Sequence, residues 1–201
     1  TCALPILAVQ NRMGIGDTII FLPFIKALSK KFNSPISLLV KESSKADQYL
    51  FQTDYIDKIL ILERDINNKN RHDGFFGSFN LIQDLKKYNF DKIFIFNSSL
   101  RFNLIARFSK IPKIYQYQLF DKNKQHITDT PKKFLKDKLD IDVNEDPNIQ
   151  INDELIFEAI KKFQINKNEL NILLGIGGSG PTKRIPSKIF LEVIDKILKI
   201  G

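Results

Sequence analysis

Residues 5–18 of the chain read PILAVQNRMGIGDT. The first five are apolar and of strand length, and a turn that contains two glycines separates them from a stretch with helical spacing that begins at Asp17. An uninterrupted apolar run of this length is typical of a strand buried on both faces of a parallel sheet. The segment therefore predicts the opening strand, turn and helix of an α/β domain.

The alternation of short apolar runs and longer amphipathic stretches continues along most of the chain. It predicts further strands at 36–40, 59–62, 92–96 and 113–118, and helices at 17–31, 44–52, 79–88, 100–108 and 131–139. The polar segment 64–77 is expected to be a loop. Because regular alternation of strand and helix requires right-handed crossovers, we expect a Rossmann-like, doubly wound parallel sheet of the α/β class.

The pattern divides the sequence into three parts. We expect residues 1–140 to form a first domain, 141–166 to be a polar linker that ends in a helix, and 167–201 to begin a second domain. That last part holds an expected strand at 171–174 and a helix at 188–199. One strand and one helix cannot bury their own apolar faces, so the second domain is expected to be truncated.

Composition restricts the partners and chemistry of the protein. The 201 residues include 31 Lys and Arg against 23 Asp and Glu, and the net charge of +8 favours nucleic acid, phosphorylated lipid or a nucleotide-sugar as partner. A single cysteine, Cys2, excludes an internal disulfide framework, and two histidines leave little for a metal site. Since no membrane span or secretory signal is visible, we expect a cytoplasmic protein.

Asp17 is the charged residue of the first glycine-containing turn, residues 13–18. The turn is not a dinucleotide-binding fingerprint, because Ile19 stands in the place of the third glycine, and no Gly-Lys-Ser/Thr follows as in a phosphate-binding P-loop. A carboxylate at this place would repel a phosphate. Asp17 is therefore expected to be the N-cap of the helix or a catalytic base.

A second turn, residues 175–184, reads GIGGSGPTKR and combines four glycines with two hydroxyls and two cations. Backbone N–H groups, Ser179, Thr182 and Lys183 could surround a diphosphate, with Arg184 as a second cation. The alternative interpretation is a solvated, glycine-rich linker.

The remaining polar residues carry weaker signals. His72, in the expected loop, is interpreted as solvated, and His126 could orient a substrate. Four lysines are expected to form a solvated helix face or one that rests on an anionic membrane surface: Lys132, Lys133, Lys136 and Lys138. Because the sequence has no RNA-binding motif, we expect no nucleic-acid partner.

Taken together, the two turns and their surroundings resemble glycosyltransferase family 9, the lipopolysaccharide heptosyltransferases. The resemblance runs over the whole chain and rests on residues 6–12, 16–17, 23, 27–28, 32, 36–40, 97–107, 126 and 179–186. The last segment, SGPTKRIP, is similar to the family's Lys-Arg-Trp-Pro segment. Two departures bear on donor preference: residues 175–177 replace His-Pro-Gly, and Ile185 replaces Trp.

The resemblance implies a GT-B fold and an inverting, metal-independent transfer that needs no cofactor. A heptose or related sugar would pass from an ADP-sugar to the anionic glycolipid of the lipopolysaccharide core, with peripheral contact at the inner face of the cytoplasmic membrane. Asp17 matches the family's general base. The implied donor-binding residues are Lys183, Thr182, Ser179 and Arg184, and those for the acceptor are Arg101, Gly16 and His126.

Other interpretations stay open. Family members bind the donor sugar and adenosine through acidic residues later than Gly201, so the chain itself is expected to be an inactive fragment. If Gly201 were the natural end, a non-catalytic module that binds a nucleotide or glycolipid would be favoured. A third interpretation is a basic α/β domain that binds RNA, and its RNA binding would depend on salt concentration.

Overall fold

A computed structural model of the chain describes residues 5–12, 14–64, 71–119, 126–177 and 184–199. The chain divides into two compact units, residues 1–152 and 153–201.

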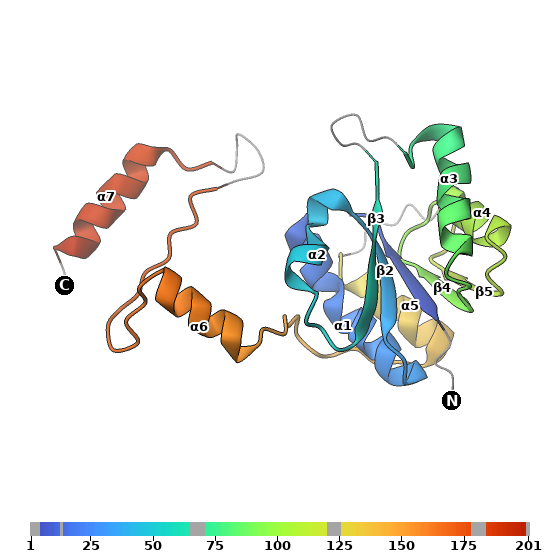
Figure 1. Cartoon of the computed structure of the whole chain (residues 1–201), viewed down its shortest axis with the longest axis horizontal. Helices are drawn as coiled ribbons and strands as arrows, with labels where there is room; N and C mark the ends of the chain where they lie inside the picture. Colours follow the sequence, from blue (N-terminus) through green and yellow to red (C-terminus); the bar gives the residue numbers. More distant parts are fainter. Residues whose placement is uncertain (1–4, 13, 65–70, 120–125, 178–183, 200–201) are drawn as a thin grey trace. The chain divides into compact units, whose positions relative to one another are not determined.

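The first unit is built on a five-stranded sheet with the order β3-β2-β1-β4-β5, in which all strand pairs are parallel (Figure 1). The strands are β1 Ile6–Gln10, β2 Ile36–Lys41, β3 Ile56–Leu62, β4 Lys92–Ile95 and β5 Lys113–Gln116. Val9 of β1 pairs in register with Leu39 on one side and Ile95 on the other. The predicted doubly wound parallel sheet is therefore confirmed.

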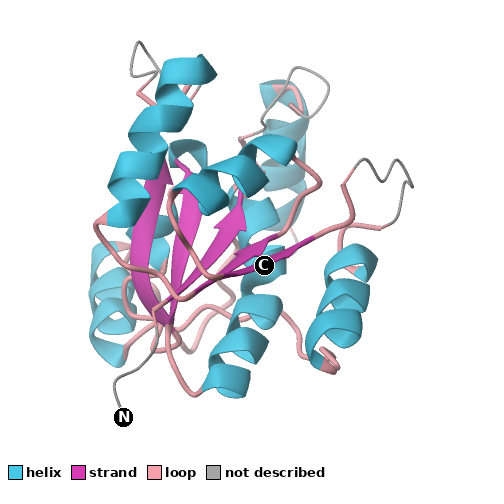
Figure 2. Ribbon diagram, turned by 90° about the vertical axis from the view of Figure 1, so that its right-hand side faces the viewer, coloured by secondary structure: helices cyan, strands magenta, loops and turns pink. Residues whose placement is uncertain are grey.

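Helices cover both faces of this sheet (Figure 2). One face carries α1 (Ile15–Phe32), α2 (Ala46–Tyr49) and α5 (Asp129–Leu139), and the other carries α3 (Gly74–Lys86) and α4 (Leu100–Phe108). Side chains alternate along β1, so that Ile6 and Ala8 pack toward α1 whereas Leu7 and Val9 pack toward α3 and α4. Two buried layers explain why β1 is apolar throughout.

Two helices differ from the expected bounds by more than two residues. The helix expected at 44–52 is a 3-10 turn, Glu42–Ser44, followed by the short α2, because Lys45 between them has a left-handed backbone with φ of 48°. Helix α3 begins at Gly74, inside the segment expected to be a loop, and Gly74 itself has φ of 62°. Glycine adopts this conformation without steric cost.

Residues 141–152, expected to be a linker, contain no helix or strand but pack on the first unit. Val143 is 5% exposed, and Ile141 and Ile149 contact the core cluster that contains α1. The Glu145 carboxylate forms ion pairs with Lys26, at 2.7 Å, and with Lys30. The segment thus covers one side of the first unit.

The second unit contains α6 (Asp153–Lys162) and α7 (Ser187–Leu198). The strand expected at 171–174 is not formed, because a strand needs a hydrogen-bonded neighbour and the described residues of this unit supply none. No described residue of this unit is buried. In the described part of the chain, no helix combines the length and the apolar character that crossing a bilayer requires.

Gly77 marks a close approach between α3 and the chain before it. A Cβ at this position would lie 2.2 Å from the carbonyl carbon of His72. We expect Gly77→Ala to lower the free energy of unfolding by about 1–3 kcal/mol in urea denaturation. Gly16→Ala is the matched control, because a Cβ there meets nothing within 4 Å and stability should stay the same or rise slightly. Equal stabilities for the two variants would contradict this account.

Candidate functional site

A cavity of about 660 Å³ opens in the first unit at the carboxyl ends of β1, β4 and β5. Its walls are the residues that follow these three strands, together with parts of α1 and α5. The strand order reverses between β1 and β4. In open α/β sheets, ligands bind outside the carboxyl ends of the strands at this reversal point.

The floor of the cavity is aromatic. Phe21, Phe96, Tyr117 and Phe134 line it, and their rings meet edge to face. The centroids of Tyr117 and Phe134 are 5.1 Å apart, and those of Phe21 and Phe96 are 5.5 Å apart. Such a packed group provides a rigid apolar surface for a ring-shaped ligand.

The Tyr117 hydroxyl is buried and has no hydrogen-bond partner within the described chain. Burial raises the pKa of Tyr117 well above its ordinary value of 10.0, although the charge of Arg12 opposes the shift. The phenol therefore stays neutral at physiological pH. Because Tyr117 lines the cavity, a small shift of its ring would present this unsatisfied O–H donor to a ligand.

Amide side chains hold the loops around the cavity together. Asn97 Nδ2 donates to Asn11 Oδ1 over 3.3 Å, which links the residues after β4 to those after β1. Gln116 Nε2 donates to the carbonyl oxygens of Asn97 and Ser99, at 3.1 and 2.9 Å. These bonds connect the ends of three strands, so the cavity wall is organised before any ligand arrives.

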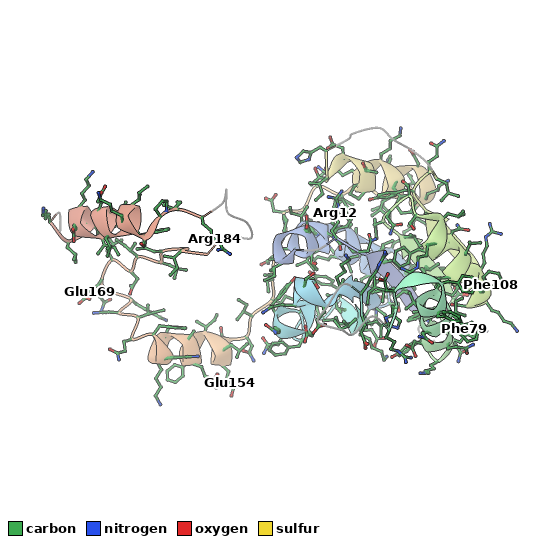
Figure 3. All side chains as sticks on the ribbon, turned by 90° about the horizontal axis from the view of Figure 1, so that it is seen from above. Arg12, Phe79, Phe108, Glu154, Glu169 and Arg184 are labelled. Carbon is green, nitrogen blue, oxygen red and sulfur yellow. The ribbon has the colours of Figure 1, made fainter. Side chains whose placement is uncertain are left out.

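The charged residues at the cavity favour an anion. Arg12, Lys133 and Lys138 line it against a single acid, Asp137. Figure 3 labels Arg12 on the turn that leads into α1. A ligand that carries carboxylate or phosphate groups matches this excess of positive charge.

All four lysines of α5 are exposed, as expected of a solvated helix face, but their surroundings differ. Lys133 and Lys138 line the cavity, whereas Lys136 is engaged in ion pairs with Asp140, at 2.7 Å, and Asp142, at 2.8 Å. The hydrogen bond to Asp140, and then that to Asp142, raises the pKa of Lys136.

Asp17 is the third residue of α1, and Gly14 is the N-cap, so the alternative of Asp17 as the N-cap is wrong. The Oδ2 atom of Asp17 nevertheless accepts a hydrogen bond from the Gly14 N–H over 3.1 Å and so stabilises the helix start. Its other carboxylate oxygen accepts no hydrogen bond from the described residues. That oxygen is therefore open to accept a proton.

Asp17 lies close to the cavity. It precedes the cavity-lining Phe21 by four residues on α1, which places the two side chains on one face with Cβ atoms about 5–6 Å apart. The buried Gln10 side chain fixes this turn, because its Nε2 donates to the Asp17 carbonyl and its Oε1 accepts from the Arg12 N–H. Gln10, at the end of β1, thus positions both Asp17 and Arg12.

Arg101, predicted on the acceptor side, is half-buried and does not line the cavity. Its Nε donates to Ser78 Oγ over 2.8 Å, and its Nη2 donates to the His72 carbonyl. Burial, and then the charge of Arg64, lower the pKa of Arg101. Its part in acceptor binding stays a prediction.

The other predicted residues also stay untested. Gly16 is exposed as the second residue of α1, and His126, also exposed, directly precedes the cavity-lining Ile127. Arg184 is exposed in the second unit. Three predicted donor residues lie outside the described residues: Ser179, Thr182 and Lys183.

His72 is buried at 4% exposure, so its interpretation as a solvated residue is wrong. Its Nδ1 accepts from the Glu63 N–H over 3.0 Å, and its Nε2 lies 3.1 Å from Asp84 Oδ2. Partial burial alone would raise the pKa of Asp84. Hydrogen bonds from Lys87, Arg71 and His72 outweigh this effect and hold the pKa well below its ordinary value of 3.8.

Several cavity residues were missed in the sequence, although a positional signal was present. Asn11, Ser98, Gln116 and Tyr117 occur at or just after the ends of β1, β4 and β5. Polar residues at the carboxyl ends of parallel strands are the expected ligand contacts in such a sheet. Within the described ranges, no cluster of His, Cys, Asp or Glu could hold a metal ion.

The fold is that of solved glycosyltransferases of the GT-B class. A family 9 glycosyl transferase from Veillonella parvula matches 98% of this chain at a TM-score of 0.76 and 20% identity. The ADP-heptose lps heptosyltransferase II of E. coli matches 98% at 0.68 and 14% identity, and E. coli heptosyltransferase WaaC with ADP matches 96% at 0.55 and 10% identity.

These likenesses cover only part of the solved proteins. The chain spans 60%, 62% and 64% of their respective lengths. No protein-family profile and no curated protein matches the sequence. At these identities the solved structures establish the shared α/β architecture.

Asp84→Asn tests the interactions that hold His72. Because the pKa of Asp84 is lowered in the folded state, its contribution is present above pH 3.8 and is lost as the pH falls below that value. We expect the variant to lose about 1 kcal/mol of stability at pH 7 and progressively less below pH 4, measured by urea denaturation across pH. Asp47→Asn, at an exposed position, should change little. A loss that is the same at every pH would contradict the assignment.

Proposed function

We propose that the protein is an inverting glycosyltransferase that moves a heptose or a related sugar from an ADP-sugar to the anionic core of lipopolysaccharide. The observation that carries this proposal is the position of Asp17, whose carboxylate stands at the start of α1 within one helical turn of the cationic, aromatic cavity. The hydrogen bonds from Gln10 to the Asp17 carbonyl and from Asn97 to Asn11 keep this arrangement in place.

In this proposal the cavity holds the acceptor sugar. Its apolar ring face lies on Phe96, Phe134 and Tyr117. Its acidic groups meet Arg12, Lys133 and Lys138. The Tyr117 O–H donates to a sugar oxygen that replaces the missing partner. Contact of this kind orients the attacking hydroxyl toward Asp17.

Asp17 then acts as the base. The acceptor oxygen forms a bond to the anomeric carbon of the donor, the bond from that carbon to the diphosphate oxygen breaks, and ADP leaves with the electron pair. The proton of the attacking hydroxyl passes to the Asp17 carboxylate. A carboxylate is a weak base, so the transfer occurs late, when the attacking hydroxyl has become acidic.

The donor diphosphate is assigned to the second glycine-rich turn. Lys183 and Arg184 would balance the charge that develops on ADP as it leaves, with Ser179 and Thr182 as hydrogen-bond donors. No metal ion or other cofactor is needed for this step. Two of the solved neighbours have ADP or ADP-heptose in their descriptions, which supports a nucleotide-sugar as donor.

Asp17→Asn separates the two roles of this side chain. The amide oxygen can still accept from the Gly14 N–H, whereas it cannot take a proton at neutral pH. We expect kcat to fall about 10²–10⁴-fold with donor affinity retained, measured with the polypeptide at its native length, ADP-heptose and deacylated lipopolysaccharide core. Unchanged turnover would overturn the assignment. Binding of both substrates without any transfer by the unsubstituted protein would favour a non-catalytic binding module.

Tyr117→Phe tests the acceptor site. Removing a buried hydroxyl that has no partner should leave the melting temperature unchanged or slightly raised, and should raise KM for the acceptor about 2–10-fold. Tyr88→Phe, outside the cavity, is the control and should leave KM unchanged. An unaltered KM for Tyr117→Phe would exclude the hydroxyl from acceptor binding.

A further inference from the structure

Helices α3 and α4 expose a group of large apolar side chains that the proposed chemistry does not use. Phe75 is 85% exposed and Phe76 is 82% exposed, values that are extreme for phenylalanine on a folded domain. We call this surface the α3–α4 apolar face; its members are Phe75, Phe76, Phe79, Leu100, Leu104 and Phe108. Contiguous apolar surface of this kind marks an interaction site.

The two helices contribute to one continuous surface. Arg101 of α4 donates to Ser78 of α3, which marks the sides on which the helices meet. Residues three, four or seven apart share one side of a helix. Phe75 therefore lies on the α4 side of α3, and Leu104 and Phe108 lie on the α3 side of α4. Figure 3 labels one phenylalanine from each helix, Phe79 and Phe108, at the outer margin of the first unit.

The surroundings of this face are positively charged. Residues 71–113 contain eight Lys and Arg against three Asp, a net charge of +5. Each acid is already paired, Asp73 with Arg64, Asp84 with Arg71 and Asp91 with Lys92. In contrast, two exposed lysines at or just after the C-terminal ends of α3 and α4 form no ion pair with any described residue: Lys86 and Lys110.

We infer that the α3–α4 apolar face docks the protein on the surface of an anionic lipid bilayer. Phenylalanine and leucine side chains enter the boundary between headgroups and acyl chains, while the surrounding lysines meet lipid phosphates. A second copy of the chain is a poor occupant, because it would bring two surfaces of the same positive charge together. This inference extends the proposed function by giving the membrane contact a defined surface.

The same face lies beside the proposed reaction site. Glu63, directly after β3, hydrogen-bonds to His72, just before α3, and α4 begins shortly after β4. Both helix starts therefore lie at the carboxyl edge of the sheet. Phe75, Phe76 and Leu100 are therefore at the edge where the cavity opens. Docking through this face brings that edge to the headgroup layer, where a lipid-linked acceptor presents its sugar.

Vesicle flotation of the whole chain tests the inference. Vesicles of phosphatidylcholine and phosphatidylglycerol in equal parts should bind the protein, and pure phosphatidylcholine should bind it much less. The variant F75S/F76S/F79S should lower the partition coefficient by about tenfold or more. Phe51→Ser is the matched control, since Phe51 is 61% exposed in the same unit but lies next to α2.

A pair of charge-reversal substitutions separates the electrostatic contribution to vesicle binding from the apolar contribution. Lys86→Glu with Lys110→Glu should weaken binding to the anionic vesicles, and the loss should shrink at high salt. Lys31→Glu with Lys132→Glu changes the net charge equally at exposed positions elsewhere and should have little effect. Equal binding to both vesicle types, or full binding by the phenylalanine variant, would overturn the inference.

Two further outcomes would also overturn it. Self-association by light scattering that the phenylalanine variant abolishes, in the absence of vesicle binding, would assign this face to a second copy. Capture of an acidic protein without vesicle binding would assign it to that partner. Because the transfer assay uses a deacylated acceptor and no bilayer, failure here is distinguishable from failure of the proposed function.

Discussion

The position of β1 at the centre of the sheet is the constraint on which the rest of the structure depends. All five residues of this strand are at most 2% exposed, and it pairs with β2 on one side and β4 on the other. The chain crosses from one side of β1 to the other when it passes from β3 to β4. The loops that follow β1 and β4 therefore diverge at the carboxyl ends of these strands. That divergence opens the cavity, and Gln10 at the same strand end fixes the turn that presents Asp17.

Much of this arrangement could be predicted from the sequence, because it follows from local periodicity. The first β-α unit can be recognised from the apolar run at 5–9, the turn that follows it and the next helix. The same pattern recurs along the chain and predicts the sheet. The side-chain environments could not be predicted in the same way. His72 lies in a polar stretch, yet it is buried and hydrogen-bonds to Glu63 and Asp84. These three residues are separated in sequence and come together only in the folded chain. The Tyr117 ring likewise belongs to the cavity because Phe134 of α5 folds over it.

Positive charge is concentrated at two different surfaces of the first unit. At the cavity it is combined with an aromatic floor and amide side chains, which suits a small anionic sugar. On α3 and α4 it surrounds exposed phenylalanine, which suits an extended interface. The lysines of α5 show how little the sequence alone says about surroundings. All four are exposed, as expected, yet Lys133 and Lys138 line the cavity whereas Lys136 pairs with Asp140 and Asp142.

The central claim is that the acceptor binds where the strand order reverses. Hydrogen exchange followed by mass spectrometry, with and without deacylated lipopolysaccharide core, tests this most directly. The account predicts slower exchange in the loops after β1, β4 and β5 and in the first turns of α5, with no change in α2 or β3. Protection that is absent from these loops, or that is confined to another part of the chain, would contradict it.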